Sequence, residues 1–404
     1  MKQRLLHTPQ GVRDIYGSEC QKKNLIKARL HHVLMQYGYQ DIETPSFEFF
    51  DIFNQEKGTV SDIEMYKFID RNNRTLVLRP DITPSIARSV AKYYEEETLP
   101  LRLSYVGNTY LNRENYQGKL TEFTQVGAEL VNDTSSSADA EIIAMMIDAL
   151  RAAGLTEFRI DIGQVEFYKG LIEEAGVTPE QEIELRQYID NKNSFGIEKI
   201  LKGFSLEETS YQALIEFMEL YGEHEVLEKA RTITSNPRSL KAIERLEKVY
   251  QILCVYGYEE YISFDLGMLT QYNYYTGIIF KGYTYGTGEP IAKGGRYDEL
   301  LALFGKNAPS IGFVIQVDEL MNAMGRQNIS VKAPARVLIL FDREMEQNAI
   351  RETLTYRKQG GRAALMKFYE ERTMAEYITY CKANQLNHIL YLKKEGEKEI
   401  IQIG

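Results

Sequence analysis

The chain has 404 residues, 44% of them apolar and only 10 of them proline, so it is long enough for two or three packed domains and lacks the bias of a disordered protein. Its formal net charge is −10. Because clustered Lys and Arg supply much of the affinity for phosphates, this net negative charge argues against a protein whose main function is to bind nucleic acid.

The cysteines and the start of the chain exclude two further classes of protein. Cys20, Cys254 and Cys381 lie far apart with no CxxC pairing, so we expect buried free thiols rather than a zinc site or a disulfide framework. No apolar run approaches the roughly 18 residues of a membrane-spanning helix, and the opening MKQRLLHTPQGVRD is polar. We therefore expect a cytoplasmic protein without a membrane segment.

The first predicted elements are a helix and a strand interrupted by proline. A helical pattern runs from Ser18 to Gln36, and Gly38 ends it. The segment YQDIETPSFEFFDIF then alternates apolar and polar residues like a half-buried strand, with Pro45 in its middle. A proline there fits an edge strand or an interface, so we expect a dimer seam around Pro45.

A hairpin and a helix follow. The strands MYKFID and RTLVLRP are joined by Asn72 and Asn73, a residue pair that tolerates the left-handed geometry of a tight turn. The segment DITP, which starts at Asp81, then begins a helix that we expect over residues 85–94.

The next two strands carry candidate polar residues on one face. They are LRLSYVGNTYL, from Leu101, and LTEFTQVGAELV, from Leu120. Gln125 and Glu129 are four residues apart on the second strand, so they share a face with Gly127 between them. A carboxylate and an amide beside small neighbours are typical of a pocket wall. A solvated sheet face is the alternative from this strand alone.

The rest of the chain predicts helices, a further strand and a separate module. The helix ADAEIIAMMIDALRAA, with Gly154 as its C-cap, precedes a strand around residues 158–162. Residues from about 164 to 258 read as a helical insertion whose charged faces are solvated surface. YISFDLG reads as a strand and YDELLALFG as a helix. After a linker near 327–334, residues 335–404 alternate strand, helix, strand, helix, strand, strand, a small α/β domain.

The stretch QYNYYTGIIFKGYTYGTGEPIAKGGRYD, residues 271–298, reads as the floor of a ligand pocket. The segment from Tyr272 to Tyr285 predicts a strand, in which the adjacent Tyr274 and Tyr275 point to opposite faces, so that one alone sits over a ligand. Glycines 294 and 295 would let the backbone approach a bound molecule. A tyrosine-rich hairpin without a ligand is the structural alternative.

Taken together, these motifs resemble those of the histidine branch of the class II aminoacyl-tRNA synthetases, over almost the whole chain. The matching segments are TPQGVRDIYG, GYQDIETPSFE, LRPDIT, EFTQVGAEL, NYYTGIIF and GGRYDELL. The resemblance implies an α+β fold: a class II synthetase-like domain over residues 1–326, with an antiparallel sheet flanked by helices and the helical insertion at about 164–258, followed by an anticodon-binding-like domain over 335–404.

The same resemblance implies a pocket for free histidine. Asp81, Thr83 and Gln125 would accept from the α-ammonium group, and Glu129 with Tyr274 or Tyr275 would hold the imidazole. This assignment is chemically reasonable because an ammonium group needs a carboxylate and neutral acceptors, and an imidazole N–H is best held by an anion.

Three arginines of that synthetase pattern are missing. Leu111 stands where an arginine would clamp the ATP α-phosphate, and Arg113 falls at the acidic position that follows. Glu319 replaces the arginine near the triphosphate, and Thr270 replaces one beside the histidine carboxylate. At roughly 1.5–3 kcal/mol for each charge-assisted contact, losing both phosphate arginines would weaken adenylate formation by about two to four orders of magnitude.

A synthetase-like chain that keeps the amino-acid pocket and loses the ATP machinery resembles the regulatory subunits of ATP phosphoribosyltransferase, and YYTGIIFKGY is itself similar to that family. The resemblance implies a non-catalytic subunit in histidine biosynthesis that acts with a short catalytic subunit. It also implies a homodimer within a hetero-octamer of four subunits of each kind, and feedback inhibition by histidine. We expect no cofactor and no metal.

Two alternatives remain, a working histidyl-tRNA synthetase and a histidine- or tRNA-sensing module without a catalytic partner. The missing arginines argue against the first. Residues 335–404 carry 12 Lys or Arg against 10 Asp or Glu, a balance that does not favour a tRNA surface. Many regulatory subunits lack a complete C-terminal domain of this kind, so the resemblance assigns no role to it. A gene for the short catalytic subunit nearby would decide against the second alternative.

Overall fold

The computed structural model describes residues 6–53, 60–113, 120–191, 193–269, 274–331 and 334–403. Thr270, Gln271 and most of the loop before Leu120 lie outside the described residues. The chain divides into two compact units, Met1–Arg13 with Ile26–Ser330 and Asp14–Leu25 with Val331–Gly404.

The first unit is built on a nine-stranded sheet of order β1-β5-β6-β12-β11-β10-β7-β9-β8. Neighbouring strands are antiparallel except for β1 with β5 and β7 with β9, so the expected α+β sheet is confirmed in a mixed form. Its strands are β1 (Gln40–Asp41), β5 (Leu101–Tyr110), β6 (Glu122–Val131), β7 (Phe158–Gln164), β8 (Tyr221–Gly222), β9 (Ile262–Asp265), β10 (Ile278–Thr284), β11 (Ala292–Arg296) and β12 (Ser310–Gln316).

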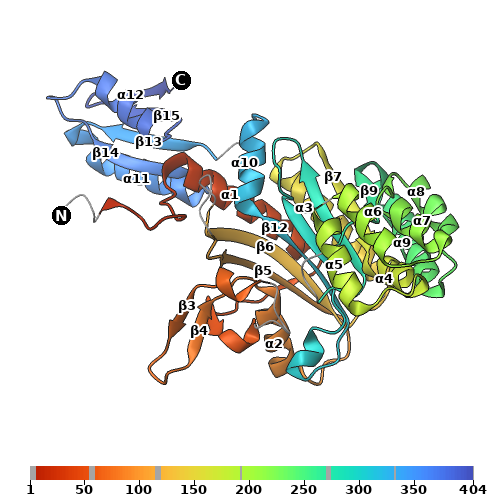
Figure 1. Ribbon diagram of the computed structural model, residues 1–404. Coiled ribbons are helices and arrows are strands. Elements are labelled where there is room, and N and C mark those ends of the chain that lie inside the picture. Colours follow the sequence, from red (N-terminus) through yellow and green to blue (C-terminus); the bar gives the residue numbers. More distant parts are fainter. Residues whose placement is uncertain are drawn as a thin grey trace. The chain divides into compact units, whose positions relative to one another are not determined.

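Helix α3 (Ser136–Ala153) covers one face of this sheet at β6 and β12 (Figure 1). The Ser135 hydroxyl accepts from the backbone N–H of Ala138 and begins the helix. Gly154 ends it with a φ of 109°, which confirms the predicted glycine C-cap. Most side chains of α3 are buried, so this helix forms the main hydrophobic layer behind the sheet.

The segment after β7 is helical, as expected, apart from the two residues of β8. Its helices are α4 (Val165–Glu174), α5 (Pro179–Asp190), α6 (Ser194–Gly203), α7 (Glu208–Phe217), α8 (Glu225–Thr232) and α9 (Pro237–Tyr256). The long α9 packs against both α3 and α4. The expectation that the charges of this segment are all solvated is wrong for Arg245, because its Nε lies 2.7 Å from Oδ2 of the buried Asp139 on α3.

The remaining helices precede, connect or follow these strands along the chain. They are α1 (Gly17–Gln36), α2 (Thr83–Tyr93) and α10 (Val317–Arg326), with 3₁₀ turns η2 (Phe50–Ile52), η3 (Asp62–Glu64), η4 (Glu259–Tyr261) and η5 (Leu301–Phe304). A helix was expected over YDELLALFG, but the structure has only the short η5 there, and Gly305 ends it with a φ of 93°.

A three-stranded sheet of order β2-β4-β3 stands beside the large one. Its strands are β2 (Phe47–Phe49), β3 (Lys67–Ile69) and β4 (Thr75–Leu78). The predicted hairpin is confirmed, since β3 and β4 are antiparallel and Asn73 has a φ of 58°. The single strand expected across Pro45 is wrong, because the chain changes sheets there, from β1 to β2.

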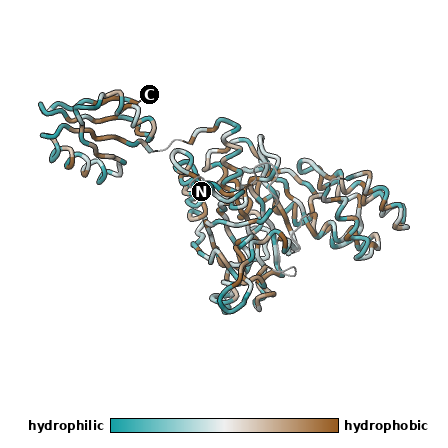
Figure 2. The backbone as a smooth tube through the Cα atoms, turned by 60° about the vertical axis from the view of Figure 1, so that its left-hand side comes forward, coloured by the Kyte–Doolittle hydropathy of each residue, from teal (hydrophilic) through white to brown (hydrophobic). Residues whose placement is uncertain are grey.

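The last module has the predicted order of strand, helix, strand, helix, strand, strand. Its elements are β13 (Arg336–Phe341), η6 (Arg343–Met345), α11 (Glu346–Lys358), β14 (Arg362–Lys367), α12 (Met374–Ala383), β15 (His388–Leu392) and β16 (Lys398–Gln402). β13 is the central strand, parallel to β14 and β15, and β16 is an antiparallel edge. In Figure 2 the hydrophobic residues of this module lie along its middle, in agreement with the burial of the central strand β13.

The cysteines differ from expectation in their burial. Cys381 is buried on α12, whereas Cys20 is half-buried and Cys254 is exposed, and all three are free thiols. Among the described residues, no helix is both long and apolar enough to cross a membrane.

A cavity around a buried glutamate

A small cavity lies on one face of the nine-stranded sheet, beside the start of α2. Its volume is about 20 Å³, which is room for about one water molecule. The lining residues come from β5, β6, β11, β12 and the adjoining loops, and they are Asp81, Thr83, Tyr105, Glu129, Tyr274, Tyr275, Lys293, Gly294, Tyr297, Gly312, Phe313 and Val314. Five of the six residues predicted to hold the ligand therefore meet in one place.

Glu129 is the central group of this cavity and is only 1% exposed. The Thr83 hydroxyl donates to its Oε1 at 2.7 Å, and the Tyr297 hydroxyl donates to Oε2. Gly312 lies opposite Glu129 on β12, where any Cβ would overlap the carboxylate. The absence of a side chain at Gly312 therefore makes the space in which Glu129 sits.

Burial controls the charge of this carboxyl group. Desolvation raises the pKa of Glu129 to about 8, although the hydrogen bonds from Tyr297 and Thr83 lower it. The pKa values of Tyr105 and Tyr297 are also raised, chiefly by burial and then by the nearby Glu129. At neutral pH the Glu129 carboxyl group is therefore mostly protonated, and a cation or a ring N–H beside it would favour its ionised form.

Asp81 and Thr83 are positioned by the start of α2. The Asp81 Oδ1 accepts from the backbone N–H of Ile82 at 2.7 Å, and the N–H of Thr83 lies 3.5 Å from the same oxygen. A carboxylate at this end of a helix is stabilised by the helix dipole. The LRPDIT segment thus places one carboxylate and one hydroxyl at the cavity.

The two tyrosines differ from the prediction in their arrangement. Tyr274 lies in a turn and β10 begins only at Ile278, so the pair is not in a strand and both rings line the cavity. Their ring centroids are 4.6 Å apart. A Cβ at Gly295 would lie 2.7 Å from the Tyr275 ring, so this glycine accommodates the tyrosine, whereas Gly294 lines the cavity itself.

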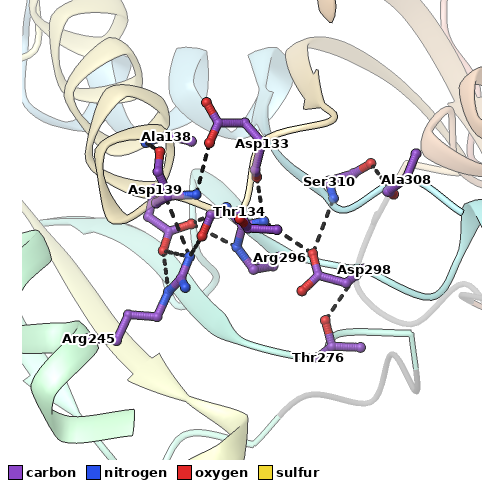
Figure 3. Close-up of polar contacts among 11 residues, drawn as sticks. Asp133, Thr134, Ala138, Asp139, Arg245, Thr276, Arg296, Asp298, Ala308 and Ser310 are labelled. Carbon is purple, nitrogen blue, oxygen red and sulfur yellow. Dashed lines mark hydrogen bonds and ion pairs between the residues drawn. The ribbon is translucent and has the colours of Figure 1, made fainter. Parts of the chain in front are cut away.

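A buried ionic cluster anchors this tyrosine segment (Figure 3). Arg296, at the end of β11, donates to Asp139 from Nε at 2.9 Å and from Nη2 at 2.6 Å, and its Nη1 lies 3.1 Å from Asp298. The N–H of Asp298 donates to the Thr276 hydroxyl at 2.9 Å, and the Thr276 N–H donates to the carbonyl of Arg296. Breaking a buried ion pair of this kind typically costs about 3–5 kcal/mol.

Sequence reasoning missed Tyr105, Tyr297 and Asp139. Tyr105 and Tyr297 are 24 and 168 residues from Glu129 in the chain, and Asp139 and Arg296 are 157 residues apart. The sequence held one signal, for Tyr105, in the alternation of side chains along β5 and β6. Tyr105 pairs with Gly127, which is two residues from Glu129, so Tyr105 lies on the same face as Glu129.

Gln125 lies on the same face of β6 but does not line the cavity. It pairs with Gly107 on β5 and with Gln316 on β12. It is 5% exposed, and its Oε1 has no hydrogen-bond partner among the described residues. Its role as a ligand for an ammonium group stays a prediction.

The positions of the missing ATP arginines have ordinary structural surroundings. Leu111 follows β5, and its N–H donates to the carbonyl of Thr121 at 2.8 Å. Arg113 pairs with Glu64 at 3.0 Å. Glu319 lies in the first turn of α10, where the helix dipole favours an anion.

The sheet, its motifs and the cavity define a class II synthetase-like protein of the histidyl branch. The family model of histidyl-tRNA synthetase matches residues 11–320. The structure of histidyl-tRNA synthetase from Nostoc sp. PCC 7120 has the same fold, with a TM-score of 0.83, 19% identity, and coverage of 98% of this chain and 97% of that one.

Other comparisons point within that class to a regulatory branch. An ATP phosphoribosyltransferase regulatory subunit/histidyl-tRNA synthetase from Bacillus halodurans has a TM-score of 0.86 and 32% identity, covering 96% of this chain and 98% of that one. The ATP phosphoribosyltransferase regulatory subunit of Ruminiclostridium cellulolyticum is 39% identical over 98% of this chain and 95% of its own, and that of Acetivibrio thermocellus is 41% identical over 88% and 85%. The chain belongs to the ATP phosphoribosyltransferase regulatory subunit family.

The close approach of Glu129 to Gly312 predicts that a side chain at position 312 destabilises the protein. Gly312→Ala should destabilise the protein by about 1–3 kcal/mol, because the new methyl group overlaps the buried carboxylate and the sheet must shift. Gly325→Ala is the matched control, since its Cβ meets nothing within 4 Å and alanine favours the helix. Urea unfolding measures both, and equal stabilities would contradict the packing described for Glu129.

Proposed function

We propose that this chain is a non-catalytic regulatory subunit that activates a short ATP phosphoribosyltransferase catalytic subunit and carries the feedback response to histidine. Membership of the regulatory-subunit family supports the first part. The cavity around Glu129 supports the second, and it is the observation on which the proposal depends. The free cysteines fit a reducing cytoplasm.

In this proposal Glu129 binds the imidazole of histidine and Asp81 binds its α-ammonium group. Thr83 and Tyr297 hold the Glu129 carboxylate in place, since each already donates to one of its oxygens. Gln125 is proposed as a further acceptor for the ammonium group. The paired rings of Tyr274 and Tyr275 would pack on the imidazole, which suits their position in the cavity wall.

The small size of the cavity supports a conformational response to the ligand. A volume of about 20 Å³ holds roughly one water, so an amino acid enters only if part of the wall moves. Tyr274 and Tyr275 are the candidates, because they are half-buried and lie in an irregular segment just before Thr276, the residue at which the ionic cluster holds the chain. A ligand that binds the opened state better than the closed one shifts the balance between them, and this is the requirement for feedback.

We propose a homodimer within a hetero-octamer of four regulatory and four catalytic chains. The three-stranded sheet supports the dimer, because it exposes a set of apolar side chains that a partner copy would cover. These side chains share one face of the sheet and are Phe47 (54% exposed), Phe49 (41%) and Phe68 (40%). Pro45 precedes this sheet in the chain, as the predicted dimer seam requires.

The chain alone should sediment as a dimer at micromolar concentration. Phe47→Asp should shift it towards monomer, because the charge would be buried in the apolar interface. Tyr285→Asp is the control, since this tyrosine is 80% exposed but lies between β10 and β11. A wild-type monomer, or equal effects of the two variants, would count against the interface.

Mixing this chain with its short catalytic subunit should switch on phosphoribosyl transfer to ATP, and histidine should then lower the rate. Couplings between sites are typically about 1–3 kcal/mol, so we expect inhibition of roughly 5- to 150-fold. A phosphoribosyl transfer rate that this chain does not raise would rule out the regulatory role.

The chain alone with histidine and ATP should leave pyrophosphate exchange at background, because Leu111 and Glu319 cannot replace the phosphate arginines.

Histidine affinity should be highest between about pH 6.5 and pH 8. Between the imidazole pKa of roughly 6.5 and the Glu129 pKa of about 8, free Glu129 is protonated and free histidine has a neutral ring. Together they carry the one proton that the carboxylate and the ring share in the complex. Below this window binding must release a proton and above it must take one up, so affinity falls by up to about tenfold per pH unit on each side.

Titration calorimetry across this range measures the profile. Glu129→Gln should cost about 1–3 kcal/mol of affinity and remove the decline on the alkaline side, because the group that ionises there is gone. An unchanged profile in this variant would place the histidine site elsewhere.

A further inference from the structure

The helical insertion is linked to the tyrosine segment of the cavity through one carboxylate that two arginines share. Asp139 lies in the first turn of α3, and its side chain is fully buried. Its Oδ1 accepts from Arg296, whereas its Oδ2 accepts from Arg245 on α9, at 2.7 Å from Nε and 2.6 Å from Nη2 (Figure 3). Each oxygen of Asp139 therefore holds a different arginine, one from the sheet and one from the insertion.

The ion pairs of this cluster run in one series from Arg245 through Asp139 and Arg296 to Asp298. Arg296 lies 3.1 Å from Asp298 through its Nη1, so it already serves two carboxylates. Without Arg245, the Oδ2 of Asp139 would lose the two donors of that arginine. Removing one partner from a buried ionic group leaves the others poorly compensated, so the position of Arg296 would no longer be fixed as firmly.

The series ends at the segment that carries the two cavity tyrosines. The N–H of Asp298 donates to the Thr276 hydroxyl, and the N–H of Thr276 donates to the carbonyl of Arg296, each at 2.9 Å. The next residue, Gly277, packs on the Arg296 side chain, since a Cβ there would lie 3.1 Å from its Cδ. Arg296 therefore fixes the two residues that directly follow Tyr275.

The insertion holds the same segment at a second point. The N–H of Val165, the first residue of α4, donates to the carbonyl of Gly277 at 3.0 Å. Helices α4 and α9 pack against each other, and Arg238 joins their first turns because it lies 2.6 Å from Glu166. The pair of helices that carries Arg245 thus holds the base of the tyrosine segment from two sides.

We propose that Arg245 is a positioning residue for the ligand site and makes histidine affinity depend on the helical insertion. This inference rests on the proposed histidine site. Arg245 acts through Asp139 and Arg296, which hold the base of the segment that carries the two cavity tyrosines. Rings that swing from a fixed base return to one position on the bound imidazole, whereas a loosened segment must be ordered by the ligand at a cost in affinity.

Titration calorimetry with histidine measures the effect of Arg245→Met. The affinity should fall by about 3- to 10-fold, the size of the ordering cost of roughly one side chain. Arg245→Lys keeps the charge and should recover part of this loss. Arg231→Met is the matched control, because Arg231 also forms an ion pair with α9, at 2.6 Å from Glu247, and this pair is not part of the cluster. It should leave the affinity at the wild-type value.

Amide hydrogen exchange without ligand, followed by mass spectrometry, tests the structural link separately. Peptides that contain Thr276 or Asp298 should exchange several-fold faster in Arg245→Met than in wild type, because the hydrogen bonds of these two amides depend on the position of Arg296. Arg231→Met should leave the exchange of these peptides unchanged.

The outcomes separate this inference from the function on which it rests. Unchanged histidine affinity in Arg245→Met overturns the role of Arg245 and leaves the histidine site standing. Equal losses in Arg245→Met and Arg231→Met also overturn it, because they indicate general loosening of the insertion. If Arg245→Met does not fold, Arg245→Lys decides in its place, since a smaller loss in the same direction is expected and wild-type affinity overturns the role.

Failure of the wild-type protein to bind histidine removes the proposed site but not the link between the insertion and the tyrosine segment. The exchange rates then decide alone. Faster exchange at Thr276 in Arg245→Met supports the positioning role, and unchanged exchange overturns it.

Discussion

A carboxylate buried in the middle of a sheet is costly, and the arrangement around Glu129 follows from that cost. Desolvation raises its pKa to about 8, and the protein responds with two hydroxyl donors, from Thr83 and Tyr297, in place of a cation. Gly312 provides the room, because a side chain there would occupy the place of the carboxylate. A group held in this way suits a ring N–H or an imidazolium, as the proposed histidine site requires.

The parts of the fold that sequence could predict depend on local signals. The hairpin at Asn73, the C-cap at Gly154 and the order of elements in residues 335–404 each follow from turn chemistry or periodicity over a few residues. The shared face of Gln125 and Glu129 is of the same kind, since it needs only the two-residue period of a strand.

Contacts between distant segments could not be predicted in this way. Asp139 pairs with Arg296, 157 residues away, and with Arg245 on a helix whose charged faces are predicted to be solvated from the sequence alone. Tyr274 and Tyr275 share the dense β-branched and aromatic pattern of the strand beside them, yet β10 begins only at Ile278. The ionic cluster fixes this segment through tertiary contacts, which override a local strand preference.

Glu129 is proposed to hold the imidazole of histidine, and the ionisation of its carboxyl group tests this claim. Carbon-13 NMR of the glutamate side chains, with the Glu129 signal assigned from Glu129→Gln, would follow its ionisation at pH 7. We expect the carboxyl group to be mostly protonated without ligand, because its pKa is about 8, and to become ionised when histidine is added. A signal that histidine leaves unchanged while it binds the protein would contradict the claim.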